Sequence, residues 1–326
     1  MALLADVRVS IPSSHGRSRK ARILRNEFAK AIEQILENHP EAAFLTGDLG
    51  FNAFEGIRER FPGRFLNTGV AEQHMIGFAA GLALSGIKPW VYSIAPFVTC
   101  RVTEFIRNDL CFHNLPVKII GNGGGYTYGV MGSTHHALED LGILKTLPNL
   151  TLYFPCAGDQ VNAAVHQMSQ QPGPSYLRLA VSPCVSSRPV IGENPATLTR
   201  CYKKGRDLTV IGVGHAVQIV LTALDLARND LNINVFGLGK FPLDTVKDSA
   251  LSDAIRDSRK VLVVEEHYLS GGFGETLSAL FSGKKFEILA AKYDLNQRYG
   301  SAAFHLDQSG ISPKHVLAAI EKELCA

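Results

Sequence analysis

Residues 67–84, NTGVAEQHMIGFAAGLAL, place an acidic residue, Glu72, at the start of a run of small apolar residues. This composition predicts a helix from Glu72 to Leu84 that packs closely against its neighbours. Burial favours the protonated form of a carboxyl group, and a carboxyl group held in that form can share a proton with a ring nitrogen. The same glutamate could instead be an N-terminal helix residue that the helix dipole favours. The segment by itself therefore leaves a chemical role and a structural role open.

Short apolar segments surround this helix at regular intervals along the first half of the chain. They lack polar alternation, as expected of strands that are buried on both faces of a parallel sheet. We expect these strands at residues 43–46, 89–94, 117–121, 150–154 and 176–179. Helical patterns separate them, and Asp159 is expected to cap one of these helices. The alternation predicts an α/β domain with a mostly parallel sheet flanked by helices.

Residues 184–200 interrupt this alternation. The segment is rich in proline, serine, glycine and asparagine, a composition that is typical of a linker. After it, apolar runs again alternate with helical patterns, which predicts a second and smaller α/β domain. The expected division is an N-terminal arm at 1–21, a first domain at 22–183, the linker at 184–200 and a second domain at 201–326.

The overall composition is ordinary for a soluble α/β protein and argues against nucleic-acid-binding, membrane and secreted proteins. Of the 326 residues, 46% are apolar and 19% are charged, and the net charge of +3 is too small to indicate nucleic acid or an acidic membrane as a partner. No apolar run reaches the roughly 20 residues that span a bilayer, and residues 1–14 lack the apolar core of a signal peptide. The six cysteines are scattered without a Cys-x-x-Cys pair, so a reducing cytoplasm fits best.

Two features resemble ligand sites but favour plainer explanations. Gly212 and Gly214 follow a predicted strand as in a dinucleotide-binding turn, but Val217 stands where the third glycine would be. Residues 135–140 contain two histidines and two acids, yet their spacing matches no standard set of metal ligands. We therefore expect an ordinary βα turn at the first position and polar capping of a helix, without a metal, at the second.

Three segments taken together resemble a known family. They are NTGVAEQH at 67–74, PWVYSIAPF at 89–97 and GSTHH at 132–136. They are similar to the pyrimidine-binding domain of the transketolase family, which uses thiamine diphosphate (ThDP). The stretches 69–86 and 114–117 are especially similar to 1-deoxy-D-xylulose-5-phosphate synthase, a member of that family.

The second half of the chain and a missing motif extend this resemblance. VFGLGKFPLD at 235–244 and VEEHYLSGGFG at 264–274 resemble the family's C-terminal domain. The family's diphosphate-binding domain carries Gly-Asp-Gly followed by an Asn, which hold the metal ion and the phosphates, and no Gly-Asp-Gly occurs in this sequence. The resemblance implies that a separate subunit carries that domain in an α2β2 heterotetramer. The implied cofactors are ThDP and Mg²⁺ or Ca²⁺, the metal being bound mainly by the partner subunit.

The resemblance assigns roles to five residues. Glu72 matches the catalytic glutamate that hydrogen-bonds N1′ of the aminopyrimidine ring and so activates the cofactor. Phe97 matches the aromatic residue that stacks on this ring, and Asp48 matches an aspartate near the cofactor. His135 matches a catalytic histidine that lies near a substrate oxygen. Arg25 falls near an arginine that contacts the substrate phosphate.

Three positions depart from the transketolase pattern. Gly123 stands in place of a histidine and Met131 in place of an aspartate, and Val181 falls where the family has an arginine for the substrate phosphate. A phosphate favours fixed donors such as a bidentate arginine. These changes argue against the standard pentose-phosphate substrates. The glycine run 121–125, with Tyr128 close behind it, predicts a reshaped and roomier mouth of the site.

Several functions are compatible with these motifs. The first is transfer of a two-carbon ketol unit from a ketose-type donor to an aldehyde acceptor, which the Ala-Glu-Gln-His run favours. The second is the β subunit of a 2-oxo acid dehydrogenase, which the lost arginine favours. A 1-deoxyxylulose-5-phosphate-synthase-like carboligase is a further alternative to the first. A non-catalytic partner subunit is a third, although the presence of Glu72 argues against it. The expectation is a transferase of carbohydrate metabolism that acts on a sugar-type substrate and is active only with a partner.

Overall fold

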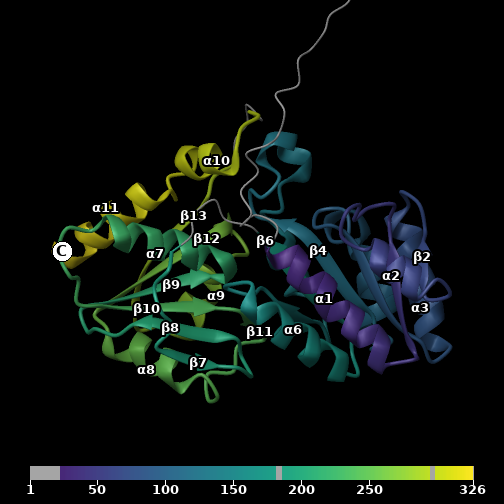
Figure 1. Ribbon diagram of the computed structural model, residues 1–326. Coiled ribbons are helices and arrows are strands. Elements are labelled where there is room, and N and C mark those ends of the chain that lie inside the picture. The colour runs from purple at the N-terminus through teal and green to yellow at the C-terminus, as the bar shows by residue number, and fades with distance from the viewer. Residues whose placement is uncertain (1–22, 181–185, 294–297, 326) are drawn as a thin grey trace, which may run out of the picture.

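The computed structural model describes residues 23–180, 186–293 and 298–325 (Figure 1). This part of the chain contains a sheet of seven strands and a sheet of six. Both sheets are mostly parallel and flanked by helices, which confirms the predicted fold class. The boundaries at 21, 183 and 200 stay a prediction, and the predicted arm lies outside the described residues. Among the described helices, none is long and apolar enough to cross a membrane.

The first sheet has the strand order β11-β5-β6-β4-β3-β1-β2, and all its strand pairs are parallel except β11–β5. Its strands are β1 (Ala42–Thr46), β2 (Phe65–Asn67), β3 (Lys88–Ile94), β4 (Lys118–Gly124), β5 (Thr151–Tyr153), β6 (Ser175–Ala180) and β11 (Lys240–Phe241). The accompanying helices are α1 (Ile23–Asn38), α2 (Glu55–Arg60), α3 (Glu72–Leu84), α4 (Thr103–Phe105), α5 (Asp140–Leu144) and α6 (Asp159–Gln170).

The strands of the first sheet are apolar on both faces because helices cover both faces. Phe44 and Tyr92 pack on the side of α1 and α6, two helices that lie side by side (Figure 1). Leu45 and Val91, their neighbours along β1 and β3, pack against α3 on the opposite face. Successive side chains of a strand point to opposite faces of the sheet. Two buried faces therefore explain why these strands show no polar alternation.

The second sheet has the order β13-β12-β9-β10-β8-β7, in which β8 runs antiparallel to both of its neighbours. Its strands are β7 (Gly192–Asn194), β8 (Thr199–Lys203), β9 (Leu208–Val213), β10 (Ile233–Leu238), β12 (Lys260–Tyr268) and β13 (Lys285–Ala291). The accompanying helices are α7 (Val217–Leu226), α8 (Ser249–Asp257), α9 (Phe273–Leu280), α10 (Ala302–Gln308) and α11 (Pro313–Cys325). The edge strand β7 lies within the segment that the composition predicts to be a linker.

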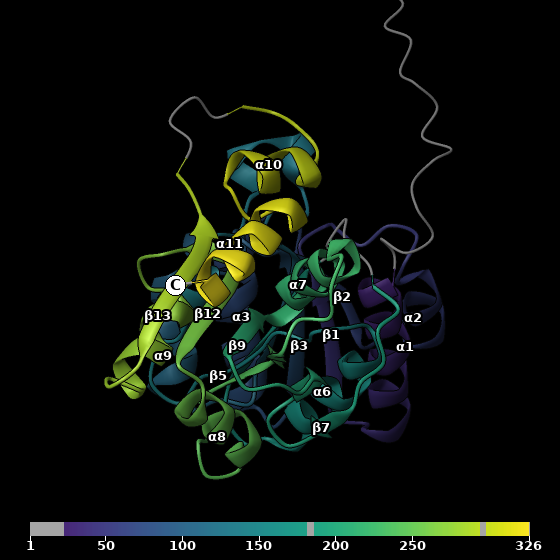
Figure 2. The ribbon, with the colours of Figure 1, turned by 90° about the vertical axis from the view of Figure 1, so that its left-hand side faces the viewer.

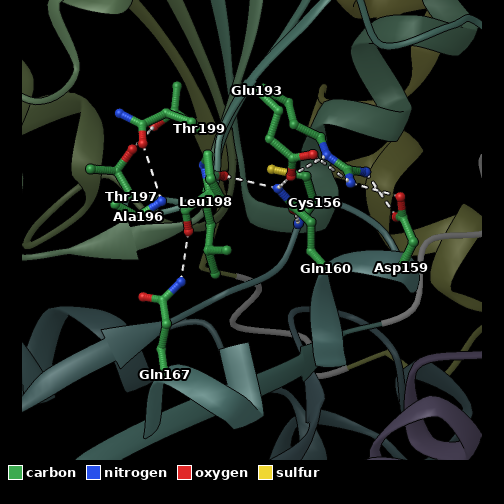
Figure 3. Close-up of polar contacts among 12 residues, drawn as sticks. Cys156, Asp159, Gln160, Gln167, Glu193, Ala196, Thr197, Leu198 and Thr199 are labelled. Carbon is green, nitrogen blue, oxygen red and sulfur yellow. Dashed lines mark hydrogen bonds and ion pairs between the residues drawn. The ribbon is translucent and has the colours of Figure 1, made fainter. Parts of the chain in front are cut away.

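The chain returns to the first sheet after it has entered the second. β11 pairs with β5, so that Lys240 lies opposite Tyr153 and Phe241 opposite Leu152. Gln160 of α6 also ties the two halves together (Figure 3). Its Nε2 donates to Oε1 of Glu193 at 2.8 Å and to the carbonyl oxygen of Leu198 at 3.2 Å. Helix α6 is therefore bound to strand β7 and to the residue that precedes β8.

Asp159 does not cap α6, so that prediction is wrong. Gly158 takes the N-cap position, and no side chain accepts a capping hydrogen bond there. Asp159 Oδ2 instead accepts from Nη2 of Arg200 at 2.6 Å, and Arg200 Nε also donates to Glu193 at 2.9 Å. Arg200 makes two charge-assisted bonds to this carboxylate, at 2.8 and 2.6 Å, and such a bidentate pair is stronger than a single bond to a backbone N–H. The pairing across the junction of the two halves therefore determines where the carboxylate points.

A buried ion pair lies within the first half of the chain, and its arginine, on β6, also bonds to the second half. Arg178 Nε donates to Asp140 Oδ2 at 2.9 Å, and these side chains are 4% and 0% exposed. Tyr176 donates its hydroxyl proton to the same oxygen at 2.8 Å, and Arg178 Nη2 donates to the carbonyl oxygen of Glu266 at 3.0 Å. Asp140 is thus a structural anchor, which accounts for one of the two acids in the polar segment 135–140.

Candidate active site

The predicted site residues follow the carboxyl ends of four neighbouring strands. β1 is followed by Asp48, β2 by Glu72, β3 by Phe97, and β4 by the loop that carries His135. These strands are adjacent in the order β4-β3-β1-β2. The carboxyl ends of adjacent parallel strands share one edge of the sheet, which is where open α/β sheets bind their ligands. The topology therefore gathers these residues at one edge.

Glu72 is the first residue of α3, and it is only 1% exposed. Ser93 Oγ donates to its Oε1 at 3.1 Å, and Arg101 Nη1 donates to its Oε2 at 2.7 Å. Gly47 comes so close that a Cβ atom there would lie 3.6 Å from Oε1. Two donors thus orient the carboxyl group, and Oε2 is the oxygen that meets the exposed side chain of Arg101.

Arg101 connects Glu72 to the other predicted residues. Its guanidinium carbon lies 4.6 Å from the centroid of the Phe97 ring. The Phe97 ring meets the His135 ring at an interplanar angle of 65°, with the centroids 5.2 Å apart. The structure therefore brings Glu72, Phe97 and His135 into one group. Neither Arg101 nor Ser93 was predicted from the sequence. Ser93 lies two residues after Val91 on β3 and so faces the same side of the sheet, which could have indicated it, whereas no pattern in the sequence marks Arg101.

Asn67, which the sequence analysis also missed, connects Asp48 to the loop before Glu72. Its Nδ2 donates to Asp48 Oδ1 at 2.8 Å. Its Oδ1 accepts from the backbone N–H of Asp48 at 3.1 Å and from that of Gly69 at 3.0 Å. Asp48 adopts a left-handed backbone conformation, with φ of 58°, which aspartate tolerates better than most residues. The pair holds the loops after β1 and β2 side by side.

Arg25 lies in α1, which packs on the same side of the sheet as Phe44 and Tyr92. Burial raises the pKa of the Tyr92 phenol, and the neighbouring Arg25 partly offsets this rise. Burial also raises the pKa of Tyr128, again with Arg25 acting in the opposite direction. Tyr92 packs with α1 rather than α3. Arg25 therefore does not take part in the contacts that join Glu72, Phe97 and His135.

The second half of the chain holds the loop that carries His135. Helix α10 packs on the short turn Gly129–Met131 of this loop (Figure 2). His305 Nε2 of α10 lies 3.2 Å from the carbonyl oxygen of Gly129, and the His305 ring stacks on Tyr126 with the centroids 5.1 Å apart. His136, next to His135, packs edge-on against both rings, and it is 8% exposed. The position of His135 therefore depends on aromatic packing between the two halves.

Burial of His136 should make stability depend on pH. Burial, and secondarily the neighbouring His305, lowers the pKa of His136 from 6.5 to about 4. Between these values the unfolded chain binds more protons than the folded chain, so the free energy of unfolding decreases as the pH falls. From pH 7 to pH 5 this group should remove about 2 kcal/mol of that free energy. Urea unfolding of the wild type and of His136→Gln at both pH values measures this: the decrease should be smaller in the variant. Equal decreases would contradict a neutral, buried His136.

The glycine run after Ile120 is filled rather than open, so the prediction of a roomier mouth is wrong at these positions. Gly123 has a φ of 92°, and a Cβ atom there would lie 2.2 Å from the Tyr128 ring. At Gly124 a Cβ atom would lie 2.6 Å from Nε of the buried Arg178. A histidine at position 123 would need the space that Tyr128 takes. Val181, where the family's arginine is missing, lies outside the described residues.

After the exposed polar residues Gln73 and His74 of its first turn, α3 carries apolar and small residues on its exposed side as well as on its buried side, and the exposed Val70 lies just before it. Val70, Phe78 and Leu84 are 75%, 39% and 71% exposed. Between them, a Cβ atom at Gly77 or Gly81 would meet no atom within 4 Å. A helix that is apolar all round is usually buried. This surface, which we call the α3 face (Val70, Gly77, Phe78, Gly81 and Leu84), therefore has the character of a contact surface for another chain.

Comparison with known proteins agrees with this geometry. Residues 21–182 match the family model described as the transketolase pyrimidine binding domain, and residues 199–316 match the transketolase C-terminal domain. A similar relative is an apulose-4-phosphate transketolase subunit of Actinobacillus succinogenes, which is 30% identical over 80% of this chain and 83% of its own length. The 1-deoxy-D-xylulose-5-phosphate synthase of Carboxydothermus hydrogenoformans is 32% identical over 78% of this chain but only 41% of its own length.

A solved structure matches along almost the whole chain. It is described as a split gene transketolase in the form of an inactive β4 tetramer. The TM-score is 0.79 at 27% sequence identity, and the match covers 93% of this chain and 98% of the other. With the two domain matches and the relative at 30% identity, this shows that the chain belongs to the transketolase family, of which it contains the pyrimidine-binding and C-terminal domains.

Proposed function

We propose that this chain is one subunit of a two-component, ThDP-dependent transketolase-like enzyme. The enzyme transfers a two-carbon ketol unit from a ketose-type donor to an aldehyde acceptor. The observation that carries this proposal is the buried carboxyl group of Glu72, which Ser93 and Arg101 orient at the edge of the sheet. Placing an acid in such a position costs free energy unless it is paired. A buried and oriented acid at a ligand-binding edge is the arrangement that a proton-transfer role requires.

The residues at this edge fit the aminopyrimidine ring of ThDP. Glu72 Oε2 already accepts a hydrogen bond from a planar N–H donor, and the Phe97 ring already faces a planar cation. Glu72 would hold a proton at N1′ of the ring, Phe97 would stack on the ring, and Ser93 would keep the carboxyl group oriented. When bound, ThDP supplies the electron sink for breaking and forming the carbon–carbon bond. His135, beside Phe97, is the candidate donor to a substrate oxygen.

A separate subunit completes the site in this proposal. It binds the diphosphate and a divalent ion, Mg²⁺ or Ca²⁺, because this sequence has no Gly-Asp-Gly motif. The match covers only 41% of the length of a single-chain synthase of the same family, and we propose that the partner subunit corresponds to part of the remainder. The relative from Actinobacillus succinogenes is itself named as one subunit of its transketolase. The α3 face is buried in the assembly, for which we propose an α2β2 heterotetramer.

The substrate is of the sugar type and differs from the standard pentose phosphates. The name of the relative from Actinobacillus succinogenes specifies apulose 4-phosphate, a phosphorylated sugar. In the chain described here, Tyr128 fills the space next to Gly123 where the family has a histidine. A hydroxyl contact made by that histidine is therefore absent or is made by Tyr128. Arg25 is proposed to contact the substrate and Asp48 the cofactor: Asp48 follows β1 at this edge, and Arg25 lies next to Tyr92 of β3 and Tyr128 of the loop after β4.

Reconstitution tests the proposed function directly. This chain is mixed with a subunit that carries Gly-Asp-Gly and Asn, with ThDP, with Mg²⁺ and with an aldehyde as acceptor. Donors from three classes are offered: free ketoses, ketose phosphates and pyruvate. We expect turnover of a ketose-type donor in the mixture and none with either subunit alone. Turnover of pyruvate but of no ketose would favour the 1-deoxyxylulose-5-phosphate-synthase-like or 2-oxo acid alternatives. Activity of this chain without a partner, or without ThDP, would contradict the proposal.

A further inference from the structure

Arg101 occupies both surfaces that the cofactor ring is proposed to use. Its Nη1 lies 2.7 Å from Oε2 of Glu72, and its guanidinium carbon lies 4.6 Å from the centroid of the Phe97 ring. Oε1 of Glu72 is already the acceptor of the Ser93 hydroxyl. Oε2 is therefore the oxygen that a bound ligand could donate to, and Arg101 donates to it in this structure.

A guanidinium and an aminopyrimidine share the features that this position selects. Both are planar and can stack on an aromatic ring, and the aminopyrimidine, once N1′ is protonated, presents an N–H group at one edge as the guanidinium does. A second planar group cannot lie on the same face of Phe97 while the guanidinium is there. We propose that Arg101 is an internal stand-in for the aminopyrimidine ring, and that it must rotate away when the cofactor binds. This inference rests on the proposed function, since it takes Glu72 and Phe97 as the binding site of the aminopyrimidine ring.

The surroundings of Arg101 allow this exchange. Its side chain is 43% exposed, whereas Glu72 is 1% exposed. Water can solvate the exposed guanidinium once it leaves Glu72, so the cost of the exchange lies with the carboxylate. A buried carboxylate without any partner would be costly, so the exchange requires a ring that replaces the contact. Arg101 therefore satisfies the buried acid in the lone subunit and yields the position to a ring that makes equivalent contacts.

Because Arg101 and the cofactor ring compete for Glu72 and Phe97, ThDP binds only the molecules in which Arg101 has left these residues. The apparent affinity for ThDP is reduced in proportion to that fraction. Arg101→Met removes the donor and the cation, so ThDP should bind more tightly to the reconstituted complex. Isothermal titration of the complex with ThDP and Mg²⁺ measures the effect, and we expect a Kd about three- to tenfold lower than that of the wild type. Arg101→Lys, which retains the charge but loses the planar fork, should shift the Kd in the same direction. It also serves as the second variant if Arg101→Met does not fold.

Arg107→Met is the matched control. Arg107 lies over the Phe112 ring, with its guanidinium carbon 4.5 Å from the centroid, and it donates to Asn108 rather than to an acid. Its removal changes the net charge by the same amount, and the Kd for ThDP should stay unchanged. A second test uses Glu72→Gln as the background. Because the charged acceptor is gone there, adding Arg101→Met should change the Kd much less than it does in the wild type.

The outcomes separate this inference from the proposed function. If the wild-type complex binds ThDP and turns over, but Arg101→Met binds ThDP equally or more weakly, the stand-in role is wrong and the proposed function stands. If neither the wild-type complex nor the Arg101 variants bind ThDP, both are wrong. Tighter binding by Arg101→Met with no change in Arg107→Met supports the inference. A structure of the cofactor-bound complex in which Arg101 still bridges Glu72 and Phe97 would overturn it.

Discussion

Replacing Glu72 by glutamine should lower kcat of the reconstituted enzyme by about 10²- to 10⁴-fold, the usual contribution of a positioned proton-transfer group. The amide has the shape of the carboxyl group, and its oxygen can still accept the hydrogen bond from Ser93. It cannot exchange a proton with a ring nitrogen. The fold and the assembly should therefore persist while turnover is lost. Steady-state rates, with size-exclusion chromatography of the same preparation, measure both properties.

Glu104→Gln is the control for this substitution. Glu104 lies in the short helix α4 and is exposed, so the same chemical change there should leave kcat within about twofold, as is usual for surface substitutions. A Glu72→Gln enzyme that retains near-normal turnover would remove the proton-transfer role. Loss of assembly in Glu72→Gln would instead give the carboxyl group a structural role, one of the two roles that the sequence alone leaves open.

Leucine at Gly77 or Gly81 should prevent association with the partner subunit and so abolish activity. In the lone subunit the new side chain would meet open space, because no atom lies within 4 Å of a Cβ at either position. Glycine inside a helix is less favourable than leucine by about 0.5–1 kcal/mol. The variant subunit should therefore be as stable as the wild type or more stable, while the new side chain keeps the partner subunit from packing on the α3 face. Thermal unfolding of the isolated chain and analytical ultracentrifugation of the mixture separate the two effects.

Gly283→Leu is the matched substitution outside the α3 face. Gly283 lies in the turn before β13, and a Cβ atom there would also meet nothing within 4 Å. Association and activity should be unaffected by that change. Normal complex formation by both Gly77→Leu and Gly81→Leu would show that the α3 face is not covered in the assembly, and the exposed Val70, Phe78 and Leu84 would then need another explanation.

The regular elements were predictable because their signals are local. Helix α3 (Glu72–Leu84) begins and ends at the predicted residues, and strand β3 (Lys88–Ile94) ends at the predicted residue and begins one residue earlier. A parallel strand with two buried faces is a continuous apolar run whatever its neighbours are. By contrast, β11 has two residues and pairs with β5 only because the chain crosses back to the first sheet. No periodic pattern marks so short a strand.

The cap of α6 and the glycine run show how tertiary contacts override local rules. Asp159 has the residue type and position of a cap, but Arg200, 41 residues further along the chain, takes its carboxylate. Gly123 and Gly124 suggested open space, but Tyr128 and Arg178 fill it. In each case the deciding partner belongs to another element. Its distance along the sequence hides it from any reading of neighbouring residues.

By itself, the sequence of this protein determined that strands alternate with helices and that an acid begins the helix after one of them. Periodicity and residue type carry that information, and they are properties of short segments. Only the tertiary structure decided that β4, β3, β1 and β2 are neighbours, and so that Glu72 meets Ser93, Arg101 and, through Arg101, Phe97. Strand order depends on the packing of the whole sheet, and side-chain partners follow from strand order, so the surroundings of the acid emerge only from the folded chain.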